Sequence, residues 1–186
     1  MKRVMDIFLS LILGGLLLIP MLIITVAIRL SSPGPALYWS DRVGAMNHLF
    51  RMPKFRSMRT DTPEVATHLL QQADSYITPV GAFLRRTSLD ELPQLWSILI
   101  GDMSFVGPRP ALFNQDDLIE QRTALGVHQL KPGLTGLAQI SGRDDLEIPI
   151  KVSFDARYLK EQSLFFDLYI MWQTFLQAIK REGVHH

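Results

Sequence analysis

Two adjacent carboxylates, Asp90 and Glu91, follow two adjacent guanidiniums, Arg85 and Arg86, within one short segment. Neighbouring acids repel each other, so stability alone rarely favours such a pair beside arginines that attract phosphate. A carboxylate can act as a nucleophile or as a metal ligand, and a guanidinium binds phosphate oxygens through parallel hydrogen bonds. The pattern therefore predicts chemistry on a phosphorylated substrate.

The same segment also fits a structural pattern, the capping box at the start of a helix. Ser88 would cap the helix and Glu91 would lie at its third position. Acidic residues in a first turn also complement the helix dipole. Pro93 argues against this register, because proline prefers the first helical position. Taken alone, the segment leaves both interpretations open.

The composition excludes a generally basic protein that coats nucleic acid. The 186 residues are enough for one domain with its own core, and their net charge is +1. Arginines outnumber lysines 13 to 6, and the planar guanidinium suits phosphate better than an ammonium group does. Residues 42–86 are rich in basic side chains, which could bind phosphate. The alternatives are that these side chains form a solvated face or contact anionic lipid. The absence of cysteine excludes disulfides and thiolate metal sites.

An uncharged and almost wholly apolar run covers residues 7–28. As a helix these 22 residues would be about 33 Å long, enough to cross a hydrocarbon core of about 30 Å. Pro20 interrupts the run and should kink the helix. Basic residues flank both ends, and such residues prefer the cytoplasmic side of a membrane. We therefore expect residues 1–30 to form a membrane-inserted, re-entrant helix, with a tilted and kinked span as the alternative.

The sequence Ser-Ser-Pro-Gly-Pro at residues 31–35 marks a break after this membrane segment. We expect residues 31–186 to form a catalytic domain at the cytosolic face. Short strands are expected at 36–40 and 48–58, joined by a turn at 42–44. Five further segments have helical patterns, namely 63–75, 89–100, 110–125, 148–162 and 164–180. The predicted fold class is therefore α+β and mostly helical, with a small β-hairpin.

The predicted helices at 89–100 and 164–180 carry more aromatic and aliphatic side chains than so small a body can easily bury. Tryptophan and tyrosine favour the boundary between lipid and water. We therefore expect amphipathic helices that lie in the membrane interface. Packing into an ordinary protein core is the alternative.

Four further segments accompany the Asp90–Glu91 pair in a fixed order. They are KFRSM at 54–58, GDMSFVGPRP at 101–110, KPGLTGLAQISGR at 131–143, and the closing aromatic helix with Asp167. Behind one N-terminal membrane segment, this arrangement resembles the bacterial sugar transferase family, the small monotopic phosphoglycosyl transferases. The resemblance covers nearly the whole chain, from about residue 2 to residue 180. Each motif is weak alone, but their joint order is highly specific.

The resemblance implies an enzyme at the cytosolic face of the bacterial inner (cytoplasmic) membrane. It would transfer sugar-1-phosphate from a UDP-sugar to undecaprenyl (polyprenol) phosphate and release UMP. This reaction would initiate assembly of an O-antigen, a capsule, an exopolysaccharide or a glycoprotein glycan. Asp90 matches the family nucleophile, which would form a covalent phosphosugar intermediate, and Glu91 matches its partner acid, which we assign as a metal ligand or a proton handler. The implied partners are the UDP-sugar, undecaprenyl phosphate and membrane lipids, while the sugar and homo-oligomer formation stay open.

The family is also magnesium-dependent, which fits the chemistry of the pair. An attack by Asp90 on an anionic diphosphate needs charge compensation, and Mg²⁺ held by Asp90 and Glu91 would supply it. Basic side chains would stabilise charge on the phosphate oxygens. The residues expected to contact the substrate phosphates or nucleotide are Lys54, Arg56, Arg86, Arg109 and Arg143. Without the resemblance, the alternatives are an ordinary strand with a charged outer face at 54–56 and a rigid helix start at Pro110.

Two other functions are compatible with an acid pair on a membrane-tethered protein. One is a carboxylate-dependent phosphate-ester hydrolase, which would release UMP to water without a lipid acceptor. The other is a non-catalytic adaptor whose basic surface binds anionic lipid or an acidic partner. A glycosidase fits poorly, because its two carboxylates usually lie about 5 Å or more apart on different elements.

Overall fold

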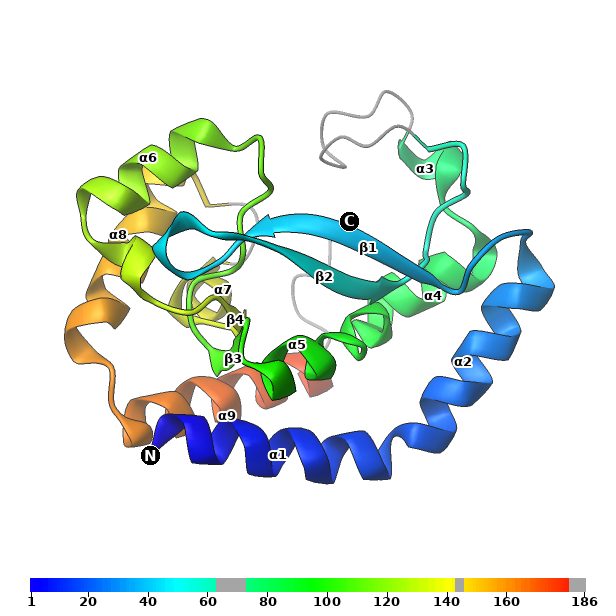
Figure 1. Ribbon diagram of the computed structural model, residues 1–186, viewed down its shortest axis with the longest axis horizontal. Helices are drawn as coiled ribbons and strands as arrows, with labels where there is room; N and C mark the ends of the chain where they lie inside the picture. The colour runs from blue at the N-terminus through cyan, green and yellow to red at the C-terminus, as the bar shows by residue number, and fades with distance from the viewer. Residues whose placement is uncertain (63–72, 143–145, 181–186) are drawn as a thin grey trace.

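The computed structural model describes residues 1–62, 73–142 and 146–180. Within these residues the chain is mostly helical and has two small two-stranded sheets, as the predicted α+β class requires. Figure 1 shows the first helix along the lower edge, the second rising from its end, and a β-hairpin across the middle of the molecule. Most of the helix predicted at 63–75 lies outside the described residues.

The N-terminal apolar segment forms two helices, α1 (Lys2–Leu16) and α2 (Leu18–Ser31), which are bent by 61° relative to each other. Pro20 lies in the first turn of α2 and has no N–H to donate to the Leu16 carbonyl. The missing bond therefore falls at the bend, one turn before the proline. None of the described helices is by itself long and apolar enough to cross a membrane. The bent pair together meets those criteria by length and composition.

The first sheet is an antiparallel hairpin of β1 (Leu37–Val43) and β2 (Leu49–Phe55), in which the first residue of β1 pairs with the last residue of β2. The predicted hairpin is confirmed, but the connection lies at residues 44–48 instead of 42–44. It contains a 3₁₀ turn, η1 (Ala45–Asn47), whose last two residues have positive φ.

The second sheet pairs β3 (Ser104–Val106) with β4 (Gly133–Thr135) in parallel. The main hydrophobic core includes β3 and draws side chains from the hairpin and from several helices. It consists of Met52, Leu95, Ile98, Met103, Phe105, Val106, Leu137, Tyr158 and Ile170. Three leucines of the N-terminal segment, Leu9, Leu13 and Leu17, pack against this core. The burial of these apolar side chains holds the N-terminal helix pair against the rest of the domain.

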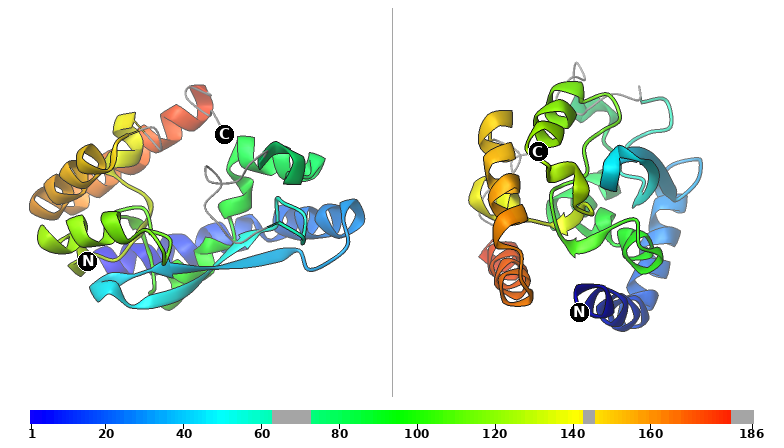
Figure 2. Two further views of the ribbon diagram at one scale, coloured as in Figure 1. Left: turned by 90° about the horizontal axis from the view of Figure 1, so that it is seen from above. Right: turned by 60° about the vertical axis from the view of Figure 1, so that its left-hand side comes forward.

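The remaining helices surround the two sheets (Figures 1 and 2). They are α3 (Ala73–Tyr76), α4 (Pro79–Thr87), α5 (Gln94–Ile100), α6 (Asp116–Ala124), α7 (Leu137–Gly142), α8 (Ile148–Glu161) and α9 (Leu164–Lys180), with 3₁₀ turns η3 (Leu89–Glu91) and η4 (Val127–Gln129). The predictions at 148–162 and 164–180 are confirmed by α8 and α9.

The prediction of one helix at 89–100 is wrong for its first half, because α5 begins at Gln94. Ser88 has a left-handed φ of 56° and ends α4, so it does not cap the next helix. It makes no side-chain cap hydrogen bond, and the capping-box interpretation is therefore wrong. Pro93 has no N–H and immediately precedes α5, so the chain forms the separate turn η3 before the helix begins.

The helix predicted at 110–125 starts later, at Asp116. The segment before it pairs with β1 instead of coiling. The Val43 N–H donates to the Ala111 carbonyl at 3.0 Å, and Leu112 forms an isolated β-bridge with Arg42. Pro110 is therefore not the first residue of a helix, because a long-range strand contact keeps this segment extended.

Candidate active site

Glu91 contacts two other residues that the sequence predicts for the site. The turn η3 places Glu91 between α4 and α5, β2 contributes Lys54, and the loop after β3 contributes Arg109. Glu91 Oε1 accepts hydrogen bonds from Lys54 Nζ at 2.8 Å and from Arg109 Nη2 at 3.1 Å. Both contacts are ion pairs between partly buried side chains.

The surroundings of Glu91 keep its carboxylate charged. Burial alone would raise the pKa of Glu91, but the charges and hydrogen bonds of Lys54 and Arg109 outweigh it and hold the pKa well below its usual range. A carboxylate with so low a pKa is a poor proton acceptor near neutral pH. The two ion pairs, together with the lowered pKa, favour a role in orienting the two cations over a role in proton transfer.

Asp90 has different surroundings, although it is the adjacent residue. It is only 8% exposed, and its carboxylate has no hydrogen bond or ion pair within the described part of the chain. Burial raises the pKa of Asp90, Lys54 lowers it, and the charge of Glu91 raises it again, with a net upward shift. Consecutive residues of a 3₁₀ turn point about 120° apart, so the two acids face different environments. A carboxylate oxygen without a partner is available to attack an electrophile.

Arg56, a predicted phosphate contact, binds the chain's own backbone. It is 6% exposed and donates to the carbonyls of Ser32 and Pro33, at 2.9 Å each, and to the Ser32 hydroxyl at 2.8 Å. These contacts tie the end of β2 to the loop that follows α2. The described contacts of its guanidinium therefore go to this loop.

The two arginines before the turn differ in their effect on Asp90. The charge of Arg85 lowers the pKa of Asp90, whereas Arg86 is exposed on α4. Arg85 is not among the residues expected to contact the phosphates, and the expected contact of Arg86 with the substrate stays a prediction. The sequence places the two arginines side by side and has no signal that separates their roles. Arg143 lies outside the described residues.

The carboxylates of Asp90 and Glu91 fit a magnesium ion whose other ligands are substrate phosphates and water. The described residues contain no group of three or more acidic, histidine or cysteine side chains that could hold a metal. Mg²⁺ does not need such a group, because it usually keeps several waters and binds one or two carboxylates together with substrate phosphates. Glu91 Oε1 is already shared by two cations, so Asp90 is the more available ligand.

Comparison with known proteins decides the family. The profile described as bacterial sugar transferase matches residues 1–181, from α1 through the Asp90–Glu91 turn to the end of α9. The chain belongs to the bacterial sugar transferase family. The resemblance seen in the order of the sequence motifs is thereby confirmed.

Several named sugar transferases are similar to this chain. An undecaprenyl-phosphate galactose phosphotransferase of Salmonella typhimurium is 40% identical over 168 residues, which cover 82% of this chain and 35% of the relative. A UDP-glucose:undecaprenyl-phosphate glucose-1-phosphate transferase of Caulobacter vibrioides is 40% identical over 193 residues, which cover 99% of this chain and 72% of the relative. A UDP-N-acetylgalactosamine-undecaprenyl-phosphate N-acetylgalactosaminephosphotransferase of Aeromonas hydrophila is 36% identical over 178 residues, with 93% and 42% covered.

The relatives differ in sugar and in length. All three names specify undecaprenyl phosphate, whereas the sugar is galactose, glucose or N-acetylgalactosamine. This sugar transferase chain spans between 35% and 42% of the length of four relatives and 72% to 74% of two others.

Proposed function

We propose that this bacterial sugar transferase moves sugar-1-phosphate from a UDP-sugar to undecaprenyl phosphate and releases UMP. The observation that carries the proposal is the pair of unlike acids on η3. Asp90 is buried and has no partner among the described residues, whereas Glu91 binds Lys54 and Arg109. The names of the relatives support both substrates. The lipid-linked product would begin the assembly of an O-antigen, a capsule, an exopolysaccharide or a glycoprotein glycan.

The reaction would proceed in two displacement steps at one phosphorus atom. First, a carboxylate oxygen of Asp90 attacks the phosphorus that carries the sugar, its bond to the UMP oxygen breaks, and UMP leaves. Then an oxygen of undecaprenyl phosphate attacks the same phosphorus, and the Asp90 carboxylate leaves as the lipid-diphosphate sugar forms. The covalent intermediate divides one difficult transfer into two easier ones.

Both steps bring anions together, so positive charge has to be supplied. Lys54 and Arg109 lie beside the acid pair, and the Arg109 side chain is 37% exposed, which allows it to reach a substrate phosphate while it binds Glu91. A guanidinium stabilises charge that develops on the equatorial phosphate oxygens. Mg²⁺ held by Asp90, with Glu91 as a second ligand, would offset the repulsion between carboxylate and diphosphate when it is bound.

The proposal places α1 and α2 as a re-entrant pair in the inner membrane, with α5 and α9 in the interface at the cytosolic face. Large apolar side chains are exposed on these two helices, namely Trp96, Ile100, Phe165, Leu168, Tyr169, Trp172, Phe175 and Ile179. Figures 1 and 2 show α1 and α9 along the same side of the molecule. Lys2 of α1 binds Asp167 of α9 at 2.6 Å, which joins the two helices. An exposed apolar side of this kind suits contact with lipid.

The test is an assay of the purified protein with Mg²⁺, each of three donors, and undecaprenyl phosphate present or omitted. The donors are UDP-glucose, UDP-galactose and UDP-N-acetylgalactosamine. We expect sustained UMP release only with the lipid, and a phosphosugar adduct on the Asp90 peptide, by mass spectrometry, in samples stopped before lipid is added. Sustained UMP release to water alone would identify a hydrolase instead.

Asp90→Asn is the matched control, because it keeps the size of the side chain and removes the nucleophilic charge. It should fold, form no adduct and release no UMP. Lipid-linked product formed by this variant would show that Asp90 is not the nucleophile. Full biological function in cells that carry an Asp90→Ala and Glu91→Ala double variant would favour the adaptor.

A further inference from the structure

The loop that carries Arg109 is held through its carbonyl groups. Residues 107–110 read Gly-Pro-Arg-Pro, and the two prolines have no N–H to contribute to a β-ladder. Instead, four consecutive carbonyls each accept a hydrogen bond from a different residue. The donors are Gly133 N to Pro108 at 2.9 Å, Arg122 Nη1 to Arg109 at 2.8 Å, Arg42 Nη1 to Pro110 at 3.2 Å and Val43 N to Ala111 at 3.0 Å.

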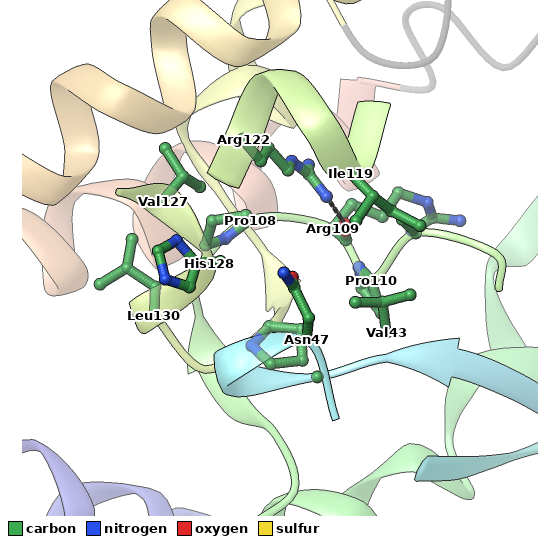
Figure 3. Close-up of a pocket in the computed structure, with 13 residues that line it drawn as sticks. Val43, Asn47, Pro108, Arg109, Pro110, Ile119, Arg122, Val127, His128 and Leu130 are labelled. Carbon is green, nitrogen blue, oxygen red and sulfur yellow. Dashed lines mark hydrogen bonds between the residues drawn. The ribbon is translucent and has the colours of Figure 1, made fainter. Parts of the chain in front are cut away.

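Arg122 supplies the contact at Arg109 itself. It lies on α6, is 8% exposed, and uses all three nitrogens of its guanidinium. Nη1 donates to the Arg109 carbonyl, while Nε and Nη2 donate to Oδ2 of Asp155 on α8 at 2.9 and 2.7 Å. Figure 3 shows the Arg122 guanidinium directed at the Arg109 backbone, with the Arg109 side chain extending away from it.

A buried ion pair is not needed to hold α6 and α8 together. Asp155 is 1% exposed, and taking two charges out of water offsets most of their mutual attraction. An apolar pair of similar size often stabilises a fold as well or better. The two helices already share such packing, since Leu118 of α6 and Val152 of α8 form a cluster with Ala111. An apolar pair could not supply a charged donor to the Arg109 carbonyl.

We propose that Arg122 and Asp155 are positioning residues, which set the Arg109 side chain against Glu91 and the donor phosphates. The contacts form one chain: Asp155 orients Arg122, Arg122 holds the Arg109 carbonyl, and Arg109 Nη2 lies 3.1 Å from Glu91 Oε1. Arg109 is thus fixed both at its backbone and at its guanidinium. The inference rests on the proposed function, because it needs Arg109 to act on the phosphates.

The test compares Arg122→Lys and Asp155→Asn in two backgrounds, the unsubstituted enzyme and Arg109→Ala. Lysine keeps the charge but cannot donate to Asp155 and to the Arg109 carbonyl from one planar group. Turnover is measured as lipid-dependent UMP release from whichever of UDP-glucose and UDP-galactose the unsubstituted enzyme uses faster. We expect Arg122→Lys to lower kcat about 10- to 100-fold, and KM for the donor to change less than about 3-fold, because a misplacement of about 1 Å can have this effect.

In the Arg109→Ala background the same substitutions should lower kcat less than about 2-fold, because the side chain they position is gone. Val152→Ala is the matched control, since Val152 is a buried apolar residue of α8 in the cluster with Leu118. It should lower the thermal stability and leave kcat within about 2-fold in both backgrounds. If Arg122→Lys does not fold, Asp155→Asn tests the positioning role by the same comparison in the two backgrounds, because asparagine is close to aspartate in size.

The outcomes separate the two levels of the proposal. Unchanged turnover in Arg109→Ala would overturn the role of Arg109 at the phosphates and, with it, this inference. If Arg109→Ala loses turnover but Arg122→Lys or Asp155→Asn lowers kcat by the same factor in both backgrounds, the pair stabilises the fold only. The positioning inference would then be overturned, while the proposed function would stand.

Discussion

Lys54 Nζ lies 2.8 Å from Glu91 Oε1, and the same ammonium group also acts on the carboxylate of Asp90. One residue of the hairpin therefore lowers the pKa of both acids. The hydrogen bond goes to Glu91 alone, so Asp90 is left with charge compensation but no direct partner among the described residues. This difference supports the proposed roles, in which Glu91 orients the cations and Asp90 attacks the phosphorus.

Lys54→Met should change the pH dependence of turnover. The substitution removes a charge that lowers the pKa of Asp90, while burial, which raises it, stays. Because the proposed attack needs an ionised carboxylate, the acid limb of the kcat/KM profile should move to higher pH. Turnover near neutral pH should fall about 10-fold or more. Lys160→Met, an exposed residue of α8, should leave the profile in place, and a shift to lower pH in Lys54→Met would contradict the electrostatic role.

Asp90→Asn should be more stable than the unsubstituted protein while it is inactive. The folded state raises the pKa of Asp90, so it prefers the protonated form, and the ionised form lowers the free energy of unfolding above that pKa. Asparagine removes this unfavourable charge, with an expected gain on the order of 1 kcal/mol at neutral pH. The difference in free energy of unfolding between the two proteins should become smaller as the pH falls through the folded-state pKa, because the unsubstituted protein regains stability. Thermal unfolding at neutral and acidic pH measures it, and a less stable variant at neutral pH would contradict it.

Glu91→Gln should behave in the opposite way. The folded state lowers the pKa of Glu91, so the carboxylate stabilises the fold at pH values above the unfolded pKa of about 4.3. That stability is lost only as the pH falls through the lowered folded-state pKa. Glutamine should reduce the free energy of unfolding by about 2 kcal/mol at neutral pH, because Lys54 and Arg109 lose their charged partner. Unchanged thermal unfolding would show that the two ion pairs contribute nothing.

Arg56→Lys should reduce stability with little change in substrate affinity. The guanidinium binds the carbonyls of Ser32 and Pro33, and an ammonium group cannot reproduce both contacts. We expect KM for the UDP-sugar to stay within about 3-fold, whereas the loss of a phosphate contact would raise it by about 10-fold or more. Steady-state kinetics beside thermal unfolding therefore decide between the structural role and the role that the family resemblance implies.

Gly34→Ala probes the same contact from the other side. Gly34 has a φ of +115°, and an added Cβ would meet the Arg56 guanidinium, so the variant should lose about 1–3 kcal/mol of stability. Gly14→Ala is its control, because a Cβ there meets nothing within 4 Å and alanine favours the helix. Equal stability of the two variants in thermal unfolding would contradict the tight fit at Gly34.

Asp167→Asn should loosen the attachment of α1 to the domain. Lys2 Nζ binds Asp167 Oδ2 at 2.6 Å, the Tyr158 hydroxyl at 3.0 Å and the Val106 carbonyl at 2.9 Å. The loss of the buried acid should lower the free energy of unfolding by about 2 kcal/mol, less than for a fully buried pair because Lys2 is partly exposed. Glu161→Gln removes an exposed pair with Arg157 and should change stability by less than about 0.5 kcal/mol. Equal losses in the two variants would contradict the importance of the buried contact.

Tryptophan fluorescence tests the interfacial side of the molecule. Trp172 on α9 and Trp39 on β1 are both exposed, but only α9 belongs to the side proposed to meet lipid. Variants that keep a single tryptophan are reconstituted with brominated lipids, which quench nearby indoles. Quenching should be strong for Trp172 and weak for Trp39, and the reverse order would place the membrane on a different face.

Much of the fold could be predicted because its signals are local. The apolar run, the kinking proline, the hairpin and the closing helices follow from hydrophobic period and from residues that restrict the backbone. The family followed from the order of the motifs. The start of α6 could not be predicted, because the extended segment before it depends on a contact between Val43 and Ala111, far apart in the chain.

The sequence by itself determined the paired acids, the surplus of arginines and the membrane-type segment, because residue identity alone fixes charge, hydropathy and chemical class. Only the tertiary structure decided which basic side chain interacts with which carboxylate. It brings Arg109 to Glu91, turns Arg56 to the loop after α2, and lets the charges of Lys54 and Arg85 lower the pKa of Asp90. It also gives adjacent carboxylates opposite pKa shifts, because burial and the distance to a cation depend on segments that meet only when the chain has folded.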